Sequence, residues 1–172
     1  MRVAVLSDIH SNIFALEAVL QDVQRQAPDL VVNLGDILYG PIAPRETYQR
    51  LMEAELLTIR GNQDRQIYEA TAAEISENPT MAFILDELGK APLDWLRNLP
   101  FDSQPEEDIY LCHGTPGSDL VYLLEDVESG EPRLRPEEEI ASLLDGQAAG
   151  LVLCGHTHVP RCIALATGQV VA

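Results

Sequence analysis

Five short apolar runs in this chain of 172 residues each lead into a side chain that can hold a metal ion. The runs are Val3–Leu6, Leu30–Leu34, Leu56–Ile59, Ile109–Cys112 and Leu151–Cys154. The side chains that follow them are, in the same order, Asp8 and His10, Asp36, Asn62, His113, and His156 with His158. Short apolar runs of this kind are typical of buried strands. Ligands of an open α/β sheet bind at the carboxyl ends of its strands, so we expect these side chains to share such an edge.

Amphipathic segments lie between the first three runs. The spacing of apolar residues predicts helices over Asn12–Gln26 and Pro44–Ala54, the first stopped by Pro28 and the second opened by its proline. The order strand, helix, strand, helix, strand is typical of a sheet covered by helices. The fold class predicted from this pattern is α/β.

The second half of the chain departs from this alternation. Residues 65–99 contain three predicted helical segments, which form either a helical cap over the site or a further layer of helices: Arg65–Ile75, Pro79–Leu88 and Pro92–Leu99. Residues 114–136 are rich in proline, glycine and acidic residues and predict a loop that lines or covers a pocket. A helix over Pro136–Leu144 and a hairpin of Cys162–Leu165 with Gln169–Val171 complete the predicted elements.

Length and composition restrict the class of protein. A chain of 172 residues fits a single domain, residues 1–172. The absence of a signal-like start and of any apolar run near ~20 residues leads us to expect a cytoplasmic protein that does not span a membrane. The net charge of −17 makes binding to extended nucleic acid unlikely and leaves homo-oligomer formation open. The three cysteines do not predict a disulfide framework.

The predicted ligands have a consistent chemistry. All four histidines of the chain follow a predicted strand. Two carboxylates, four imidazoles and one amide suit first-row transition metals better than calcium. Asp8-x-His10 and His156-x-His158 place two ligands two residues apart. Each pair serves either one metal centre or, after a turn, two different ones.

Together these segments resemble the calcineurin-like metallophosphoesterase superfamily, in its small bacterial phosphodiesterase branch. The matching segments are Asp8-Ile9-His10, Gly35-Asp36, Gly61-Asn62-Gln63-Asp64, His113-Gly114 and Gly155-His156-Thr157-His158. The resemblance implies two packed mixed β-sheets flanked by helices, in a four-layer sandwich. Relative to the family pattern, the C-terminal strands of this chain look shortened.

The resemblance also implies a site. Asp8, His10, Asp36 and His158 would hold one divalent metal ion, and Asp36, Asn62, His113 and His156 the other. The metals would be Mn, Fe, Ni or Zn, and a hydroxide bridging them would be the nucleophile. The substrate would be a small phosphorylated molecule, either a phosphodiester or a nucleotide phosphoanhydride. Asp36, Asn62, Gln63 and Asp64 are the predicted catalytic residues.

One motif position differs from the family pattern. Gln63 stands where the family usually has a histidine assigned to the leaving group, and glutamine cannot transfer a proton at neutral pH. Arg60 and Arg65 flank this motif and are either phosphate-binding residues or members of surface salt bridges. Two functions are alternatives to the hydrolysis of a phosphodiester or nucleotide phosphoanhydride. One is that of a serine/threonine protein phosphatase, and the other is that of a non-catalytic interaction module similar to the retromer subunit of this fold.

Overall fold

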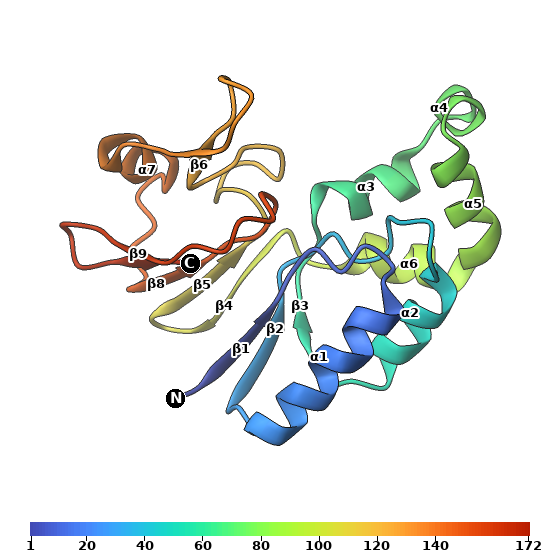
Figure 1. The fold of residues 1–172 in the computed structure, drawn as a ribbon, viewed down its shortest axis with the longest axis horizontal. Coiled ribbons are helices and arrows are strands. Elements are labelled where there is room, and N and C mark those ends of the chain that lie inside the picture. The colour runs from blue at the N-terminus through green and yellow to red at the C-terminus, as the bar shows by residue number, and fades with distance from the viewer. The chain divides into compact units, whose positions relative to one another are not determined.

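The computed structural model describes residues 1–172 and divides into two compact units, Met1–Pro100 and Phe101–Ala172 (Figure 1). Each unit has a sheet and a hydrophobic core of its own. The single domain expected from chain length therefore stays a prediction. No helix of either unit combines the length and apolar character needed to cross a bilayer.

The first unit is built on three parallel strands in the order β1-β2-β3. These are β1 (Val3–Leu6), β2 (Leu30–Asn33) and β3 (Leu57–Thr58), with Val3 opposite Leu30 and Val32 opposite Leu57. Two helices connect them, α1 (Ile13–Gln26) and α2 (Pro44–Met52). Parallel pairing places all three carboxyl ends at the same edge, as predicted.

The boundaries of α1 follow from local chemistry. The side chain of Asn12 caps the helix by accepting a hydrogen bond from the Ala15 N–H at 3.1 Å. Ala27 ends it in the left-handed conformation, directly before Pro28. Leu16 and Leu20 are buried on the face that packs into the core of this unit.

Four consecutive helices complete the first unit: α3 (Asn62–Glu69), α4 (Ala72–Glu77), α5 (Pro79–Leu88) and α6 (Lys90–Asn98). The predicted helix Arg65–Ile75 was wrong in its continuity. The helix is interrupted before Thr71, which is the N-cap of α4. The Thr71 hydroxyl accepts a hydrogen bond from the Glu74 N–H, and the Glu74 carboxylate accepts one from the Thr71 N–H. This reciprocal capping starts a new helix.

These helices belong to the core of the unit. Ile67, Ile84 and Leu96 are fully buried and lie in one hydrophobic cluster with Leu6 and Leu16. Residues 65–99 therefore stabilise the unit whether or not they also cap the site, and their role as a cap stays a prediction.

The second unit holds a five-stranded mixed sheet in the order β4-β5-β8-β10-β9. Its strands are β4 (Asp102–Glu106), β5 (Ile109–Cys112), β8 (Leu151–Leu153), β9 (Ile163–Ala164) and β10 (Val170–Val171). The three inner strands are parallel, and the two edge strands run antiparallel to their neighbours. The predicted hairpin of the C-terminal strands is confirmed by the pairing of β9 with β10.

Two features of this unit differ from the predictions. β4 was missed because its sequence, Asp-Ser-Gln-Pro-Glu, is polar throughout, which an edge strand tolerates. The predicted loop 114–136 contains a short antiparallel ribbon of β6 (Glu125–Asp126) and β7 (Arg133–Leu134). The helix α7 (Glu137–Leu143) follows as predicted and buries Ile140 in the core of the second unit. With seven helices flanking its sheets, the protein has the predicted α/β class.

Candidate metal centre

The first unit brings four of the predicted ligands to the carboxyl ends of its parallel strands. Asp8 and His10 follow β1, Asp36 follows β2, and Asn62 opens α3 four residues after the end of β3. Backbone hydrogen bonds join the loop after β1 to the loop after β2. The Asp8 N–H donates to the Gly35 carbonyl at 2.9 Å, and the His10 N–H donates to the Asp36 carbonyl at 3.0 Å.

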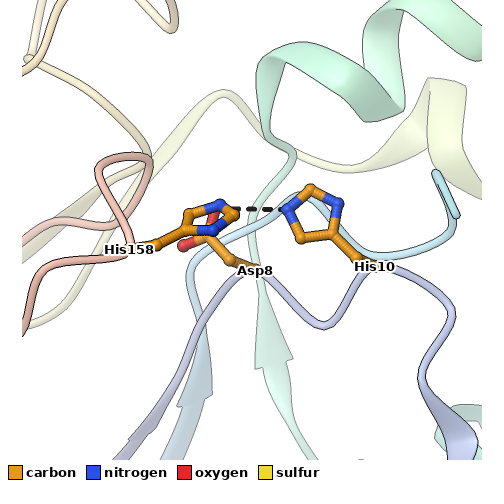
Figure 2. A group of neighbouring side chains, drawn as sticks. All are labelled: Asp8, His10 and His158. Atoms are coloured by element: carbon orange, nitrogen blue, oxygen red, sulfur yellow. Dashed lines mark ion pairs between the residues drawn. The ribbon is translucent and has the colours of Figure 1, made fainter. Parts of the chain in front are cut away.

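Asp8 and His10 present their ligand atoms toward each other. The Nε2 atom of His10 lies 3.9 Å from the Oδ1 atom of Asp8, as the dashed line in Figure 2 shows. The other ring nitrogen, Nδ1, lies 3.0 Å from the Tyr39 carbonyl oxygen. A proton on Nδ1 would be donated to this carbonyl, which leaves Nε2 as the atom for a metal ion.

Asp36 is nearly buried, with 2% of its surface exposed, and its environment fixes its carboxylate. Its Oδ1 accepts a hydrogen bond of 2.9 Å from the Gln63 N–H in the first turn of α3, where the helix dipole favours a negative charge. Gly61 permits this approach, because a Cβ atom there would lie 2.2 Å from the same oxygen. The glycine is therefore required by the position of Asp36.

Asp64 is fully buried and holds the loop after β2 against the start of α3. Its carboxylate accepts from the Gly61 N–H and the Ile37 N–H, both at 2.9 Å, and from the Leu38 N–H at 3.4 Å. Burial, and next the charge of Asp36, raise the pKa of Asp64 to about 6 against the lowering effect of these hydrogen bonds. All of these bonds go to the backbone, so the geometry gives Asp64 a positioning role.

The second unit brings His113 and His156 together. Their ring centroids are 4.9 Å apart, and each offers a ligand atom within 4.8 Å of the other. The Gly155 N–H donates to the His113 carbonyl at 2.8 Å, which ties the two loops at the ends of β5 and β8. His158 follows two residues later with an exposed side chain.

His156 is positioned by two residues that the sequence analysis did not single out. The ring of Tyr122 lies on the imidazole with centroids 4.3 Å apart, and Nε2 of His156 lies 3.3 Å from the Leu120 carbonyl oxygen. A proton on Nε2 would be donated to this carbonyl, which would leave Nδ1 of His156 as the atom for a metal ion. Both residues come from the predicted loop 114–136, and nothing in their local sequence marks their contact with a histidine more than thirty residues away.

Removing the Tyr122 ring should weaken metal binding. In a Tyr122→Ala variant the imidazole of His156 loses the surface that holds its orientation, and we expect the affinity for a divalent ion to fall about tenfold. Isothermal titration of the metal-free protein with Mn²⁺ or Zn²⁺ measures this. Tyr122→Phe keeps the ring and should bind as the wild type does. Equal affinity of the alanine variant would contradict this role.

The backbone is strained at the predicted ligands. Eight non-glycine residues have a positive φ, and five of them are predicted metal ligands: Asp8, His10, Asp36, His156 and His158, with φ of 53°, 46°, 53°, 76° and 56°. Aspartate and histidine tolerate this conformation better than most residues, yet each instance still costs of order 1 kcal/mol or more. Strain of this kind concentrates at functional sites.

The donor set fits divalent transition-metal ions. The predicted ligands of the first unit are two carboxylates, one amide and the imidazole of His10, and those of the second unit are three imidazoles. Imidazole nitrogens with carboxylate oxygens suit manganese, iron, nickel or zinc. In both His10 and His156, one ring nitrogen lies within hydrogen-bonding distance of a backbone carbonyl oxygen. Such a contact is usual for ligating histidines.

The remaining predicted residues lie close to this arrangement in the first unit. Gln63 donates its backbone N–H to Asp36, while the terminal oxygen of its side chain is buried without a protein partner. Arg65 forms an ion pair with Glu69 at 3.1 Å on α3. Arg60 donates its backbone N–H to the Pro100 carbonyl at 2.9 Å. Substrate binding by either arginine stays a prediction.

A comparison with protein families agrees with this reading. The model of the calcineurin-like phosphoesterases matches residues 1–160. The chain belongs to this family. A metallophosphoesterase from Sphaerobacter thermophilus superposes with a TM-score of 0.75 and 29% identity, over 95% of this chain and 63% of that one.

Two further relatives complete the comparison. A stretch of 62 residues is 39% identical to the protein MJ0912 of Methanocaldococcus jannaschii, which is 36% of this chain and 26% of that protein. A putative diadenosine tetraphosphatase superposes with a TM-score of 0.65 and 19% identity, over 99% of this chain and 82% of that one, which shows a shared fold. The matched region is thus about a quarter of the archaeal protein and under two thirds of the Sphaerobacter protein.

Proposed function

We propose that this calcineurin-like phosphoesterase uses two divalent metal ions to hydrolyse phosphodiesters or nucleotide phosphoanhydrides. The observation that carries the proposal is the left-handed backbone at five predicted ligands. A fold tolerates such strain where the surrounding structure holds the residues for a purpose. Because the chain belongs to the calcineurin-like phosphoesterases, we infer that these residues are held in this conformation to bind metal ions.

The proposal assigns the ligands as follows. Asp8, His10, Asp36 and His158 hold one ion, and Asp36, Asn62, His113 and His156 hold the other. When bound, two such ions would lower the pKa of a coordinated water and offset the charge that develops on the phosphoryl group. The metal is one of manganese, iron, nickel and zinc, because these match the ligand set.

The chain's own residues orient this site. Gln63 donates its backbone N–H to Asp36, and its side-chain amide oxygen is buried without a hydrogen-bond partner. The NH2 group of this side-chain amide could donate a hydrogen bond to a phosphoryl or leaving oxygen, but it cannot deliver a proton. The buried carboxylate of Asp64 joins the loop after β2 to the loop before α3 by accepting hydrogen bonds from the backbone of both.

A substrate panel tests the reaction class. The protein, stripped with a chelator and reloaded with one metal at a time, should hydrolyse bis(p-nitrophenyl) phosphate and show little activity on simple alkyl monoesters. Dinucleoside polyphosphates in the same panel separate diesters from anhydrides. A reloaded protein that binds metal but cleaves neither would overturn the proposal, and efficient release of phosphate from phosphoserine peptides would favour the protein phosphatase instead.

The rate should depend steeply on the leaving group. Without an acid at Gln63, a poor leaving group loses proton assistance that is typically worth about 10²–10⁴-fold, whereas a nitrophenolate needs little help. A series of methyl aryl phosphates with increasing phenol pKa measures the slope. Gln63→His should raise the rate on the poorest leaving groups by roughly 10–100-fold and change the nitrophenyl ester little. Gln63→Asn is the control, since it restores no acid, and a shallow slope in the wild type would show that another group supplies the proton.

A further inference from the structure

A cavity of about 520 Å³ lies within the first unit among α3, α4, α5 and the loop that follows β2. Met81 and Ala70 contribute apolar surface, and Tyr39, Thr71 and Asn78 contribute polar groups. The volume is in the range of small-molecule sites. It is therefore large enough for one organic group of a substrate.

Tyr39 connects the cavity directly to the candidate metal centre. Its carbonyl oxygen lies 3.0 Å from Nδ1 of His10, and its side chain lines the cavity. The Tyr39 hydroxyl accepts a hydrogen bond of 2.9 Å from the Asn78 side chain, which fixes the ring. Arg65 also lines the cavity, one helical turn beyond Asn62. The cavity thus borders residues that contact the Nδ1 side of His10 and that follow Asn62 in the first turns of α3.

The charges that line the cavity disfavour an anion. Three glutamates face it, Glu69, Glu74 and Glu77, against the single cation of Arg65. Glu69 forms the ion pair with Arg65 at 3.1 Å, and Glu74 caps α4 at Thr71. Glu77, at the C-terminal end of α4, takes part in neither interaction. The net charge of the lining is therefore −2, carried by Glu74, which keeps its charge while it caps the helix, and by Glu77.

An aromatic ring beside carboxylates is a favourable environment for an organic cation. An ammonium group over a tyrosine face gains electrostatic attraction, and nearby carboxylates add to it. A second phosphate, as in the leaving part of a phosphoanhydride, would meet repulsion from the same carboxylates. A cavity with this lining would favour a substrate with a cationic group over one with a second phosphate.

We propose that this cavity binds the alcohol part of a phosphodiester, and that this alcohol carries a positive charge, as an amino alcohol or a quaternary ammonium alcohol does. The inference rests on the proposed function and narrows its substrate class. Tyr39 and Glu77 are then specificity-determining residues, while the predicted metal ligands carry out the hydrolysis of any diester.

Two esters of matched shape test the inference. p-Nitrophenyl phosphocholine and p-nitrophenyl 3,3-dimethylbutyl phosphate differ only in the replacement of the positive nitrogen by carbon. Water cleaves the same P–O bond in both, with release of nitrophenolate. The metal-loaded protein should have a kcat/KM about tenfold higher for the choline ester. Hydrolysis of neither ester would overturn the proposed function, whereas equal values for both would overturn the cationic subsite alone.

A charge reversal locates the effect in the cavity. Glu77→Lys changes the lining by two charge units and should lower the preference for the choline ester about fivefold. Glu46→Lys on α2 makes the same change in net charge at an exposed position outside the cavity and should leave the preference unchanged. In the metal-free protein, choline should shift the backbone amide resonances of Thr71 and Asn78 more than 3,3-dimethylbutan-1-ol does. Equal effects of the two lysine variants, or equal shifts, would overturn the assignment.

Discussion

Replacing Asp36 with asparagine should lower kcat/KM for bis(p-nitrophenyl) phosphate by about 10³-fold. The reason is that several kcal/mol of metal-dependent stabilisation of the transition state would be lost, and each ~1.4 kcal/mol corresponds to a tenfold change in rate. Asp36 is the ligand proposed to serve both ions, and its charge would offset their mutual repulsion. Asparagine has nearly the same shape and tolerates the left-handed φ of 53° at this position. It also retains an oxygen to accept the Gln63 N–H. The loss should therefore come from the charge and not from the fold.

The controls separate these two causes. Asp22→Asn, on the exposed face of α1, makes the same change in net charge and should keep full activity. Metal-free Asp36→Asn should unfold at the same temperature as the metal-free wild type or slightly above it, because the variant lacks the repulsion between the Asp36 and Asp64 carboxylates. Activity within tenfold of the wild type at saturating metal would contradict a bridging role for Asp36.

Truncating Asp64 should destabilise the protein by about 3–5 kcal/mol. Asp64→Ala leaves the N–H groups of Gly61, Ile37 and Leu38 buried without their acceptor, and each lost acceptor costs about 1–3 kcal/mol. Part of this cost is offset, because the carboxylate itself is unfavourably buried, as its raised pKa shows. Urea unfolding of the metal-free protein measures the difference.

A conservative replacement refines this expectation. Asp64→Asn keeps one oxygen, which can serve either the Gly61 N–H or the N–H groups of Ile37 and Leu38, but not both sides. Its loss of stability should fall between those of the wild type and the alanine variant. If Asp64→Ala were as stable as the wild type, the carboxylate would not be what joins the Asp36 loop to α3.

The ends of the buried strands could be predicted from sequence because local rules determine them. A short apolar run followed by glycine and a polar residue indicates a strand end, and parallel pairing brings such ends to one edge. Asp8, Asp36 and Asn62 illustrate the second rule, since they lie two, three and four residues beyond the ends of β1, β2 and β3. The same rules missed β4, whose polar sequence resembles a loop, and joined α3 to α4 across Thr71.

The residues that position the ligands could not be predicted, because their contacts are distant in sequence. Tyr39 supports His10 from 29 residues away, and Leu120 contacts His156 from 36 residues away. In each case the partner is a backbone carbonyl, which every residue has, so residue type gives no signal. Asp64 was predicted as a catalytic residue from its motif, but only its three backbone donors reveal a positioning role.

The positive φ values are a second property that only the structure reveals. Sequence marks glycine as the residue suited to this conformation, and Gly35 does adopt it, with φ of 100°. The neighbouring Asp36 adopts it as well, without the freedom of glycine. The strained turn after β2 thus contains both a glycine and a predicted metal ligand, and this supports the proposed metal site.

Metal stoichiometry measured together with activity tests the central claim most directly. Protein stripped with a chelator should be titrated with Mn²⁺ or Zn²⁺ while bound metal, by elemental analysis after gel filtration, and hydrolysis of bis(p-nitrophenyl) phosphate are followed in the same samples. The proposed function predicts no activity in the stripped protein and full activity when two ions per chain are bound. Diesterase activity that persists without metal, or binding of two ions with no hydrolysis of any phosphate ester, would contradict it.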